Sequence, residues 1–255
     1  MVFLGGLWRL NERYAWMSLR SYRVESADPA LEQRFWDIFP SRCLRFWPFF
    51  IRKSQDIGEF LERTSPIIVR TRMTGLGSFS TEIKLLSPWL IVKWRGQTWC
   101  LSREGRMWNT SDGTLSIRQM EIPKKPLWII PELTAASSGD QALPKGVFPS
   151  IFSTEPMEGF LAGFGKESWF KDIQEIVLDR RAGADLFRFK LVFGKQEFMV
   201  LVQRDKYGWR ELNIAFEHIL ERLRKEGGNH LIDATYEDKI VVSALTASTG
   251  EGSSK

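Results

Sequence analysis

Apolar and polar residues alternate along the chain in two periods, and each period predicts one type of secondary structure. In residues 186–193 every second side chain is apolar, which is typical of a strand with one buried face. In residues 212–223 apolar side chains recur every three or four positions, which predicts an amphipathic helix that ends at Gly227-Gly228. The same patterns predict strands at 173–178 and 198–203 before this helix, and at 231–236 and 239–243 after it.

The first third of the chain predicts a small unit in which two helices lie between strands. Asp28 offers a capping carboxylate, and Pro29 suits the first position of a helix. The expected elements are a strand at 18–24, a helix from Asp28 that Pro40 stops, a helix after Ser54 with Ile57, Phe60 and Leu61 on its inner face, and strands at 67–72 and 78–85 joined through Gly75 and Gly77.

The middle of the chain changes to short β-segments, at 89–94, 97–102 and 105–109. Residues 112–150 hold five prolines, and proline lacks the N–H that a central strand needs. We therefore expect this stretch to be loop or sheet margin, followed by a short helix within 154–171. The fold class is α+β, with a mixed, β-rich second half that ends in a helix and an edge strand.

Composition and charge support two globular domains. The apolar fraction of 43% is enough to form sizeable cores, and no run of 18 apolar residues is present. Residues 1–110 carry 17 Lys and Arg against 10 Asp and Glu, whereas the rest carry 19 against 21. The net charge of +5 therefore belongs to the first part, at +7, and the second part is at −2.

Residues able to support catalysis are scarce, so we expect no catalytic, cofactor-binding or metal-binding residues. The chain has two histidines, of which His218 is expected on a solvated helix face and His230 in a loop. Gly75 and Gly77 lack the third glycine and following helix of a phosphate-binding loop. Cys43 and Cys100 allow either one disulfide or two separate thiols.

Two aromatic-rich stretches leave more than one interpretation open. The tryptophans at 89, 94, 99 and 108 favour core packing over a carbohydrate-binding platform, because they alternate along short strands. In residues 42–53 four cations alternate with Phe46, Trp47, Phe49 and Phe50. These aromatic side chains are consistent with loop residues packed on a small sheet, with a surface facing anionic lipid, or with nucleic-acid binding.

The order of these elements and several short motifs resemble the FtsQ/DivIB family of bacterial cell-division proteins. The motifs are Pro88-Trp89, residues 97–108 (QTWCLSREGRMW), and residues 232–236 (IDATY) near the end. Leu101 to Trp108 stand where the family has "L-V-D-x-x-G-x-V-F", but the family's Asp is absent here. The resemblance covers about residues 18–245.

The resemblance implies a domain plan and a location. Residues 18–87 would form a POTRA domain (βααββ) and residues 88–245 the family's β domain, followed by a disordered tail at 246–255. Family members have a transmembrane helix before the POTRA domain, so residues 1–17 would be the membrane-proximal remnant of such an anchor, truncated in this sequence. The protein would then be a single-pass protein of the cytoplasmic membrane at the division septum, with its bulk on the extracytoplasmic side.

The resemblance also implies a function without enzymatic activity. The protein would be a divisome scaffold that binds small FtsB/DivIC-like and FtsL-like proteins by β-strand addition and helps control septal peptidoglycan synthesis. Its partner contacts would fall at Tyr236, Asp238, Ile240 and Val242, with no nucleic acid and no small-molecule substrate. A proline at Val241 or Val242 is then expected to abolish partner capture. The alternative function is nucleic-acid binding through the basic, aromatic first domain.

Overall fold

The structure, a computed structural model, describes residues 17–40, 46–109, 123, 126–131, 145–181, 184–203 and 208–245. Residues 1–16, Cys43 and the tail from 246 lie outside the described residues, and with them the predictions on the anchor remnant, the pairing of Cys43 and the disordered tail. The fold is α+β. It divides into two units between Ser87 and Pro88, and residues 145–148 group with the first unit.

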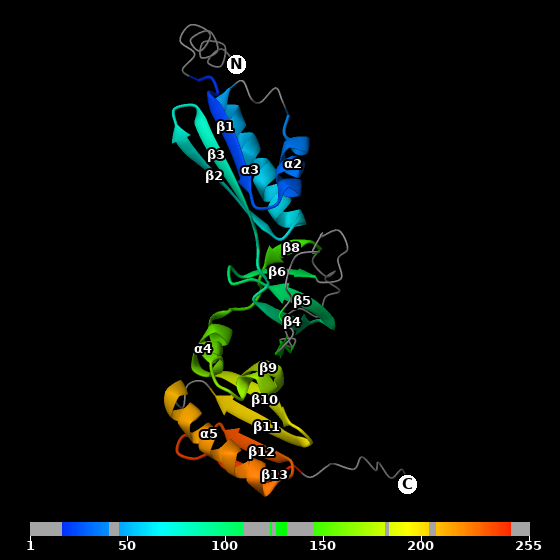
Figure 1. The fold of residues 1–255 in the computed structure, drawn as a ribbon, viewed down its shortest axis with the longest axis vertical. Helices are drawn as coiled ribbons and strands as arrows, with labels where there is room; N and C mark the ends of the chain where they lie inside the picture. The colour runs from blue at the N-terminus through cyan, green and yellow to red at the C-terminus, as the bar shows by residue number, and fades with distance from the viewer. Residues whose placement is uncertain are drawn as a thin grey trace, which may run out of the picture. The chain divides into compact units, whose positions relative to one another are not determined.

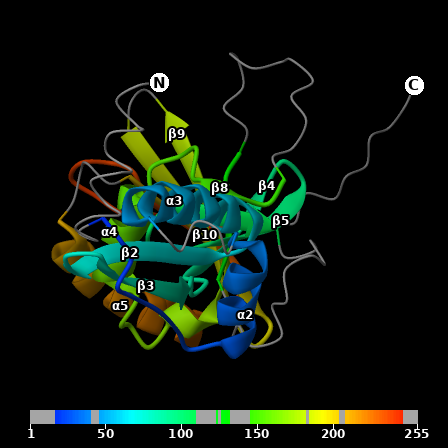
Figure 2. The same cartoon turned by 90° about the horizontal axis from the view of Figure 1, so that it is seen from above.

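The first unit is a three-stranded sheet with two helices. The strands have the order β1-β3-β2, with β1 parallel and β2 antiparallel to β3. Figure 2 shows α3 lying along one face of this sheet. The elements are β1 (Ser21–Ser26), α2 (Pro29–Ile38), α3 (Trp47–Thr64), β2 (Ile67–Gly75) and β3 (Ser78–Leu85).

The core of the first unit is the layer between its helices and its sheet. The prediction for α2 is confirmed, because the Asp28 carboxylate accepts a hydrogen bond from the N–H of Ala30. Aromatic rings dominate the layer, and those of Phe39 and Phe50 lie 5.1 Å apart between the two helices. The buried members are Val24, Phe35, Phe39, Phe50, Ile57, Leu61, Ile67, Phe79 and Ile83.

Helix α3 corrects the prediction that the second helix begins after Ser54. It begins at Trp47, because Pro48 falls in the first turn, where the missing N–H has no intrahelical partner to lose. Phe50 is thereby fully buried. Phe60 was expected on the inner face but is 52% exposed. The helical period from Phe50 instead brings Ser54, Ile57 and Leu61 inward.

A ten-stranded mixed sheet has the order β13-β12-β11-β10-β9-β7-β4-β5-β6-β8, and every strand but β8 lies wholly in the second unit. Its strands are β4 (Leu90–Trp94), β5 (Gln97–Leu101), β6 (Arg106–Asn109), β7 (Leu127–Ile129), β8 (Val147–Pro149), β9 (Ile173–Arg181), β10 (Ala184–Phe193), β11 (Gln196–Gln203), β12 (His230–Ala234) and β13 (Val241–Ala244). The helices of the second unit are α4 (Glu155–Phe164), α5 (Trp209–Glu226) and a 3-10 turn (Phe170–Asp172). Figure 1 labels these elements.

Strand β7 corrects the prediction that residues 112–150 hold no central strand. It pairs in parallel with both β4 and β9, and Trp128 at its centre is fully buried. The prediction failed because Pro126 and Pro131 lie just outside the three paired residues, so neither removes a ladder donor. The rest of this stretch, apart from 123, 126, 130–131 and 145–150, lies outside the described residues.

Aromatic side chains fill the core of the second unit. The ring of Phe160 in α4 contacts those of Trp128, Phe187, Phe189 and Trp209 at centroid distances of 4.9–5.8 Å. The tryptophans at 94, 99 and 108 are at most 6% exposed, so the core-packing interpretation is confirmed for these three.

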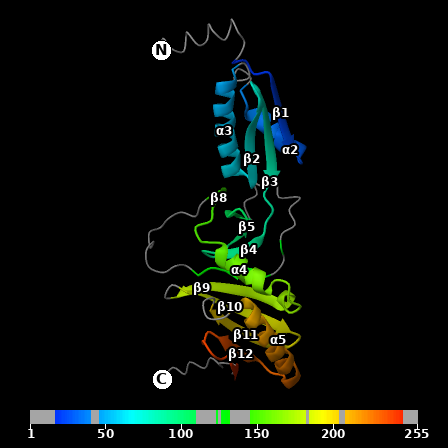
Figure 3. The ribbon, with the colours of Figure 1, turned by 90° about the vertical axis from the view of Figure 1, so that its left-hand side faces the viewer.

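Helix α5 covers one face of the sheet where β10, β11 and β12 lie side by side (Figure 3). The predicted stripe is present, with Leu212, Phe216, Leu220 and Leu223 buried, and the helix ends at Gly227 as expected. Gly227 has a φ of 79°, a conformation that glycine adopts without strain. Because β11 and β12 are parallel, the chain needs a crossover between them, and α5 provides it.

Truncating Phe160 tests the importance of the aromatic core. Phe160→Ala removes a fully buried ring that contacts helix α5 and strands β7 and β10, so we expect the free energy of unfolding to fall by about 3–5 kcal/mol. The change is measured by urea denaturation of the full chain, followed by tryptophan fluorescence. Ile151→Ala is the matched control, because Ile151 is 62% exposed and its truncation is expected to change stability by less than about 0.5 kcal/mol.

Candidate binding edge at strand β13

Four strands end the two sheets, and their sequences differ in the features that block edge pairing. Charged side chains and proline at an edge discourage another strand from joining it. Strand β1 carries Arg23 and Glu25, β2 carries Arg70 and Arg72, and the three-residue β8 ends in Pro149. Strand β13 (VVSA) contains neither charge nor proline.

The margin at β2 is partly closed by the helix beside it. A groove of about 800 Å³ runs between α3 and β2. Within it the Glu62 carboxylate accepts a hydrogen bond of 2.8 Å from the N–H of Val69, a donor that would otherwise be open to an added strand. The other two carboxylates of the groove are also engaged, Glu59 with Arg63 at 3.7 Å and Glu82 with Lys84 at 2.9 Å. We infer that this groove is a protected edge rather than a reactive site.

The margin at β13 is open by comparison. All four residues of β13 are exposed, and Val241 and Val242 keep 38% and 39% of their surface in contact with solvent. Tyr236 and Leu245, just outside the strand, are exposed to a similar degree. Apolar side chains therefore gather at the edge that also lacks charge.

The register of β13 fixes which of its peptide groups point outward. Strand β13 is antiparallel to β12, with Val242 opposite Ile232 and Val241 opposite Asp233. The N–H of Leu245 donates to the carbonyl of Asn229, which marks that pair as hydrogen-bonded. Because hydrogen-bonded and non-bonded pairs alternate along an antiparallel ladder, the peptide groups of Val241 and Ser243 face β12, and those of Val242 and Ala244 face away.

The outward peptide groups are available to a partner. Within the part of the chain that the structure describes, nothing bonds to the N–H or C=O of Val242 or Ala244. These two residues therefore present two donors and two acceptors at the spacing of a β-ladder. One incoming strand can pair with all four.

The face of the sheet under α5 continues past the helix at this edge. Val242 lies opposite Ile232, so the two side chains are on one face, which α5 buries completely at Ile232. Helix α5 does not cover Val242, since this side chain is 39% exposed. An added strand would therefore meet apolar surface as well as free peptide groups.

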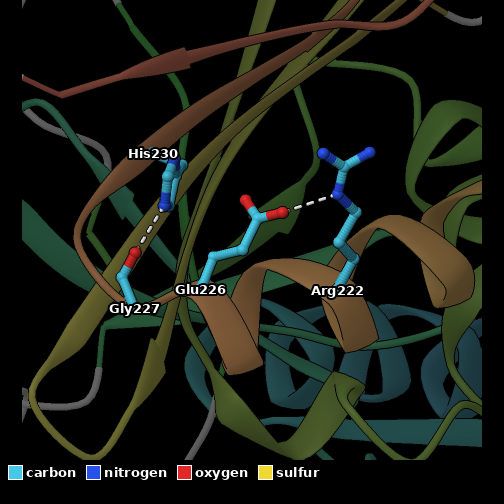
Figure 4. A network of polar contacts seen from close by, with 4 residues as sticks. All are labelled: Arg222, Glu226, Gly227 and His230. Carbon is cyan, nitrogen blue, oxygen red and sulfur yellow. Dashed lines mark hydrogen bonds and ion pairs between the residues drawn. The ribbon is translucent and has the colours of Figure 1, made fainter.

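Polar contacts lie at the end of α5 and in the turn that leads to β12 (Figure 4). Arg222 Nε donates to Glu226 Oε1 at 2.6 Å in the last turn of the helix, and this hydrogen bond raises the pKa of Arg222. The His230 ring packs against Phe198, and its Nε2 lies 2.8 Å from the carbonyl oxygen of Gly227. His230 was expected in a loop but begins β12, because it pairs with β11 and β13 at once.

The four predicted contact residues fall on one continuous segment of the edge. Tyr236 and Asp238 lie in the exposed bend after β12, which Asp233 shapes by accepting hydrogen bonds from the N–H and hydroxyl of Thr235. Ile240 is half-buried just before β13, and Val242 lies within it. The sequence reasoning missed Ala244, whose outward peptide group only the register reveals.

The other candidate site residues do not lie together in one site among the described residues. Among the described residues no cluster of His, Cys, Asp or Glu could hold a metal ion, and His218 lies exposed on α5. Cys100 is buried with a free thiol, whose pKa burial raises to about 11. Within the basic, aromatic stretch, Phe50 is buried and Trp47 packs on Phe79, which confirms the packing role of these two rings.

A membrane-crossing helix was also sought in the part of the chain that the structure describes. None of its helices combines the length and apolar content that a crossing requires. The segment before residue 17, on which the anchor prediction falls, lies outside this search.

Comparison with known proteins does not identify a relative. No family model matches the chain, and no curated protein matches it. The geometry of the β13 edge is therefore the feature that points to a function.

Proline substitutions at Val241 and Val242 test which N–H groups of β13 point toward β12 and which point away. Val241→Pro removes the N–H that faces Asp233, so we expect local destabilisation of about 1–3 kcal/mol and faster amide exchange across residues 231–234. Val242→Pro removes an N–H that bonds to no described residue, so exchange in β12 should stay near the wild-type rate. The measurement is hydrogen–deuterium exchange of the full chain; equal acceleration by both variants would contradict the register.

Proposed function

We propose that the protein is a binding scaffold that captures one strand of another protein at the β13 edge. The observation that carries the proposal is the pair of outward, unbonded peptide groups at Val242 and Ala244 on an uncharged margin. Main-chain hydrogen bonds would supply affinity in this mode, and the pockets for alternate side chains would supply specificity.

The exposed side chains around the edge define the partner strand. On the α5 side, the side chain opposite Val242 would have to be apolar, because it would extend the buried face that includes Ile232. Near the bend the edge becomes polar, with Asp238 and Lys239 exposed and the Lys239 ammonium 5.4 Å from the Tyr236 ring. A short strand with an apolar centre and a polar end is the fitting partner.

The resemblance to the FtsQ/DivIB family gives this partner an identity. We propose that unit 1 is a POTRA domain, that unit 2 is the family's β domain, and that the captured proteins are FtsB/DivIC-like and FtsL-like. In support, the first unit has the order strand, helix, helix, strand, strand, and the open edge is the last strand of the described chain. The protein would then act outside the cytoplasmic membrane at the septum, in the control of peptidoglycan synthesis.

A binding role is consistent with the contacts of the carboxylates in the groove between α3 and β2. Glu59, Glu62 and Glu82 each contact a cation or a backbone N–H. Contacts of this kind are typical of carboxylates that stabilise the fold locally.

Substitutions at Val242 test whether its backbone N–H, rather than its side chain, is needed for strand capture. Val242→Pro removes the outward N–H, and we expect co-purification of the FtsB/DivIC-like and FtsL-like proteins of the same organism to fall at least about 10-fold. Val242→Ile is the matched control, since it keeps the N–H, the β-branch and the apolar surface, and it should retain capture. The thermal unfolding of both variants is measured in parallel.

Two outcomes would contradict strand capture at this edge. One is undiminished co-purification with Val242→Pro in a protein that unfolds at the wild-type temperature. The other is binding that falls steeply between low and physiological salt, because phosphate-driven binding to nucleic acid has that dependence and strand pairing does not.

A further inference from the structure

Three segments of the first unit meet at the end where its described chain begins. Ser18 forms a bridge with Phe46, the residue before α3, and the N–H of Trp47 donates to the carbonyl of Met17. The N–H of Arg20 donates to the carbonyl of Gly77 in the turn between β2 and β3. Gly77, with a φ of 73°, allows this approach, since a Cβ there would lie 2.5 Å from the Ser18 carbonyl oxygen. We call this end, formed by residues 17–20, 46–53 and 72–78, the tip.

The tip exposes large apolar side chains. Phe49 in the first turn of α3 is 53% exposed, and Leu76 in the turn between β2 and β3 is 50% exposed. The half-buried ring of Phe46 lies 5.2 Å from that of Phe49. Figure 1 shows the start of α3 and the turn between β2 and β3 at the same end of this unit.

The charges of the tip are of one sign. Its three segments contain four cations, at Arg20, Arg52, Lys53 and Arg72, and no carboxylate, and of these Lys53 lies 4.0 Å from the Asp56 carboxylate further along α3. The first turn of α3 holds no acidic residue either, so the positive end of the helix dipole is not neutralised there. The last turns of the same helix, by contrast, carry Glu59 and Glu62.

We propose that the tip is a peripheral binding surface for anionic phospholipid. Phenylalanine and leucine side chains enter the boundary between headgroups and acyl chains, while arginine and lysine bind lipid phosphates beside them. A protein partner would require carboxylates to match these cations and a complementary surface for the scattered apolar side chains. A bilayer surface provides both features over any area. The proposal is independent of strand capture at β13.

Vesicle sedimentation of the full chain tests this proposal. We expect binding to phosphatidylcholine vesicles to rise about 10-fold when phosphatidylglycerol is included, and to weaken with salt. The double variant Phe49→Ser/Leu76→Ser and the double variant Arg20→Gln/Arg52→Gln should each lose most of this gain. Phe60→Ser is the matched control, because Phe60 lies on the same helix at 52% exposure but outside the tip.

The apolar run before Arg9 is present in every variant, so any vesicle binding by that run is the same in all of them. Amide exchange then shows which residues contact the vesicle. Vesicles with phosphatidylglycerol should slow exchange at residues 46–50 and 74–78 and leave residues 58–62 unchanged. The proposal is overturned if both tip variants bind like Phe60→Ser, or if the tip is not protected. Equal binding to neutral vesicles would overturn it as well, because the cations would then contribute nothing.

Discussion

The main constraint on this structure is the unpaired peptide groups at the edges of its two sheets. Every backbone N–H and C=O inside a sheet has a partner, and the outward groups of an edge strand do not. Three of the four margins of this protein manage that constraint through charge, proline or a covering carboxylate, as Glu62 does for Val69. The fourth, β13, has none of these features and keeps its valines exposed.

The elements before β13 determine that this edge exists at all. Because α5 carries the chain across the sheet, β12 joins β11 in parallel, and the short bend after β12 returns the chain as an antiparallel margin. The buried stripe of α5 fixes the helix over β10 to β12, and the contacts of His230 with Phe198 and Gly227 fix the start of β12. The open edge is therefore supported by a buried helix stripe and a well-anchored neighbouring strand, which is the condition for a rigid binding template.

Much of this fold follows from local patterns in the sequence. The cap at Asp28, the alternation in residues 186–193 and the stripe of α5 each specify an element through its own residues, and these predictions are confirmed. The position of a proline explains two of the corrections, because Pro48 lies in the first turn of a helix and the prolines around β7 only flank a central strand. In both cases the outcome depends on the exact position of one missing N–H.

The binding edge was only partly predictable for a different reason. Exposed apolar residues near the end of the chain are visible in the sequence, and the family resemblance directed attention to Tyr236, Asp238, Ile240 and Val242. The direction of each peptide group depends on the register between β12 and β13, which the sequence does not specify, and that register brings in Ala244.

Residue-resolved amide exchange of the protein bound to its partner tests the central claim most directly. The account predicts new protection at the N–H groups of Val242 and Ala244, with those of Val241 and Ser243 unchanged because β12 already binds them. Protection that appears at the β2 margin, or equally at all four residues of β13, would contradict it.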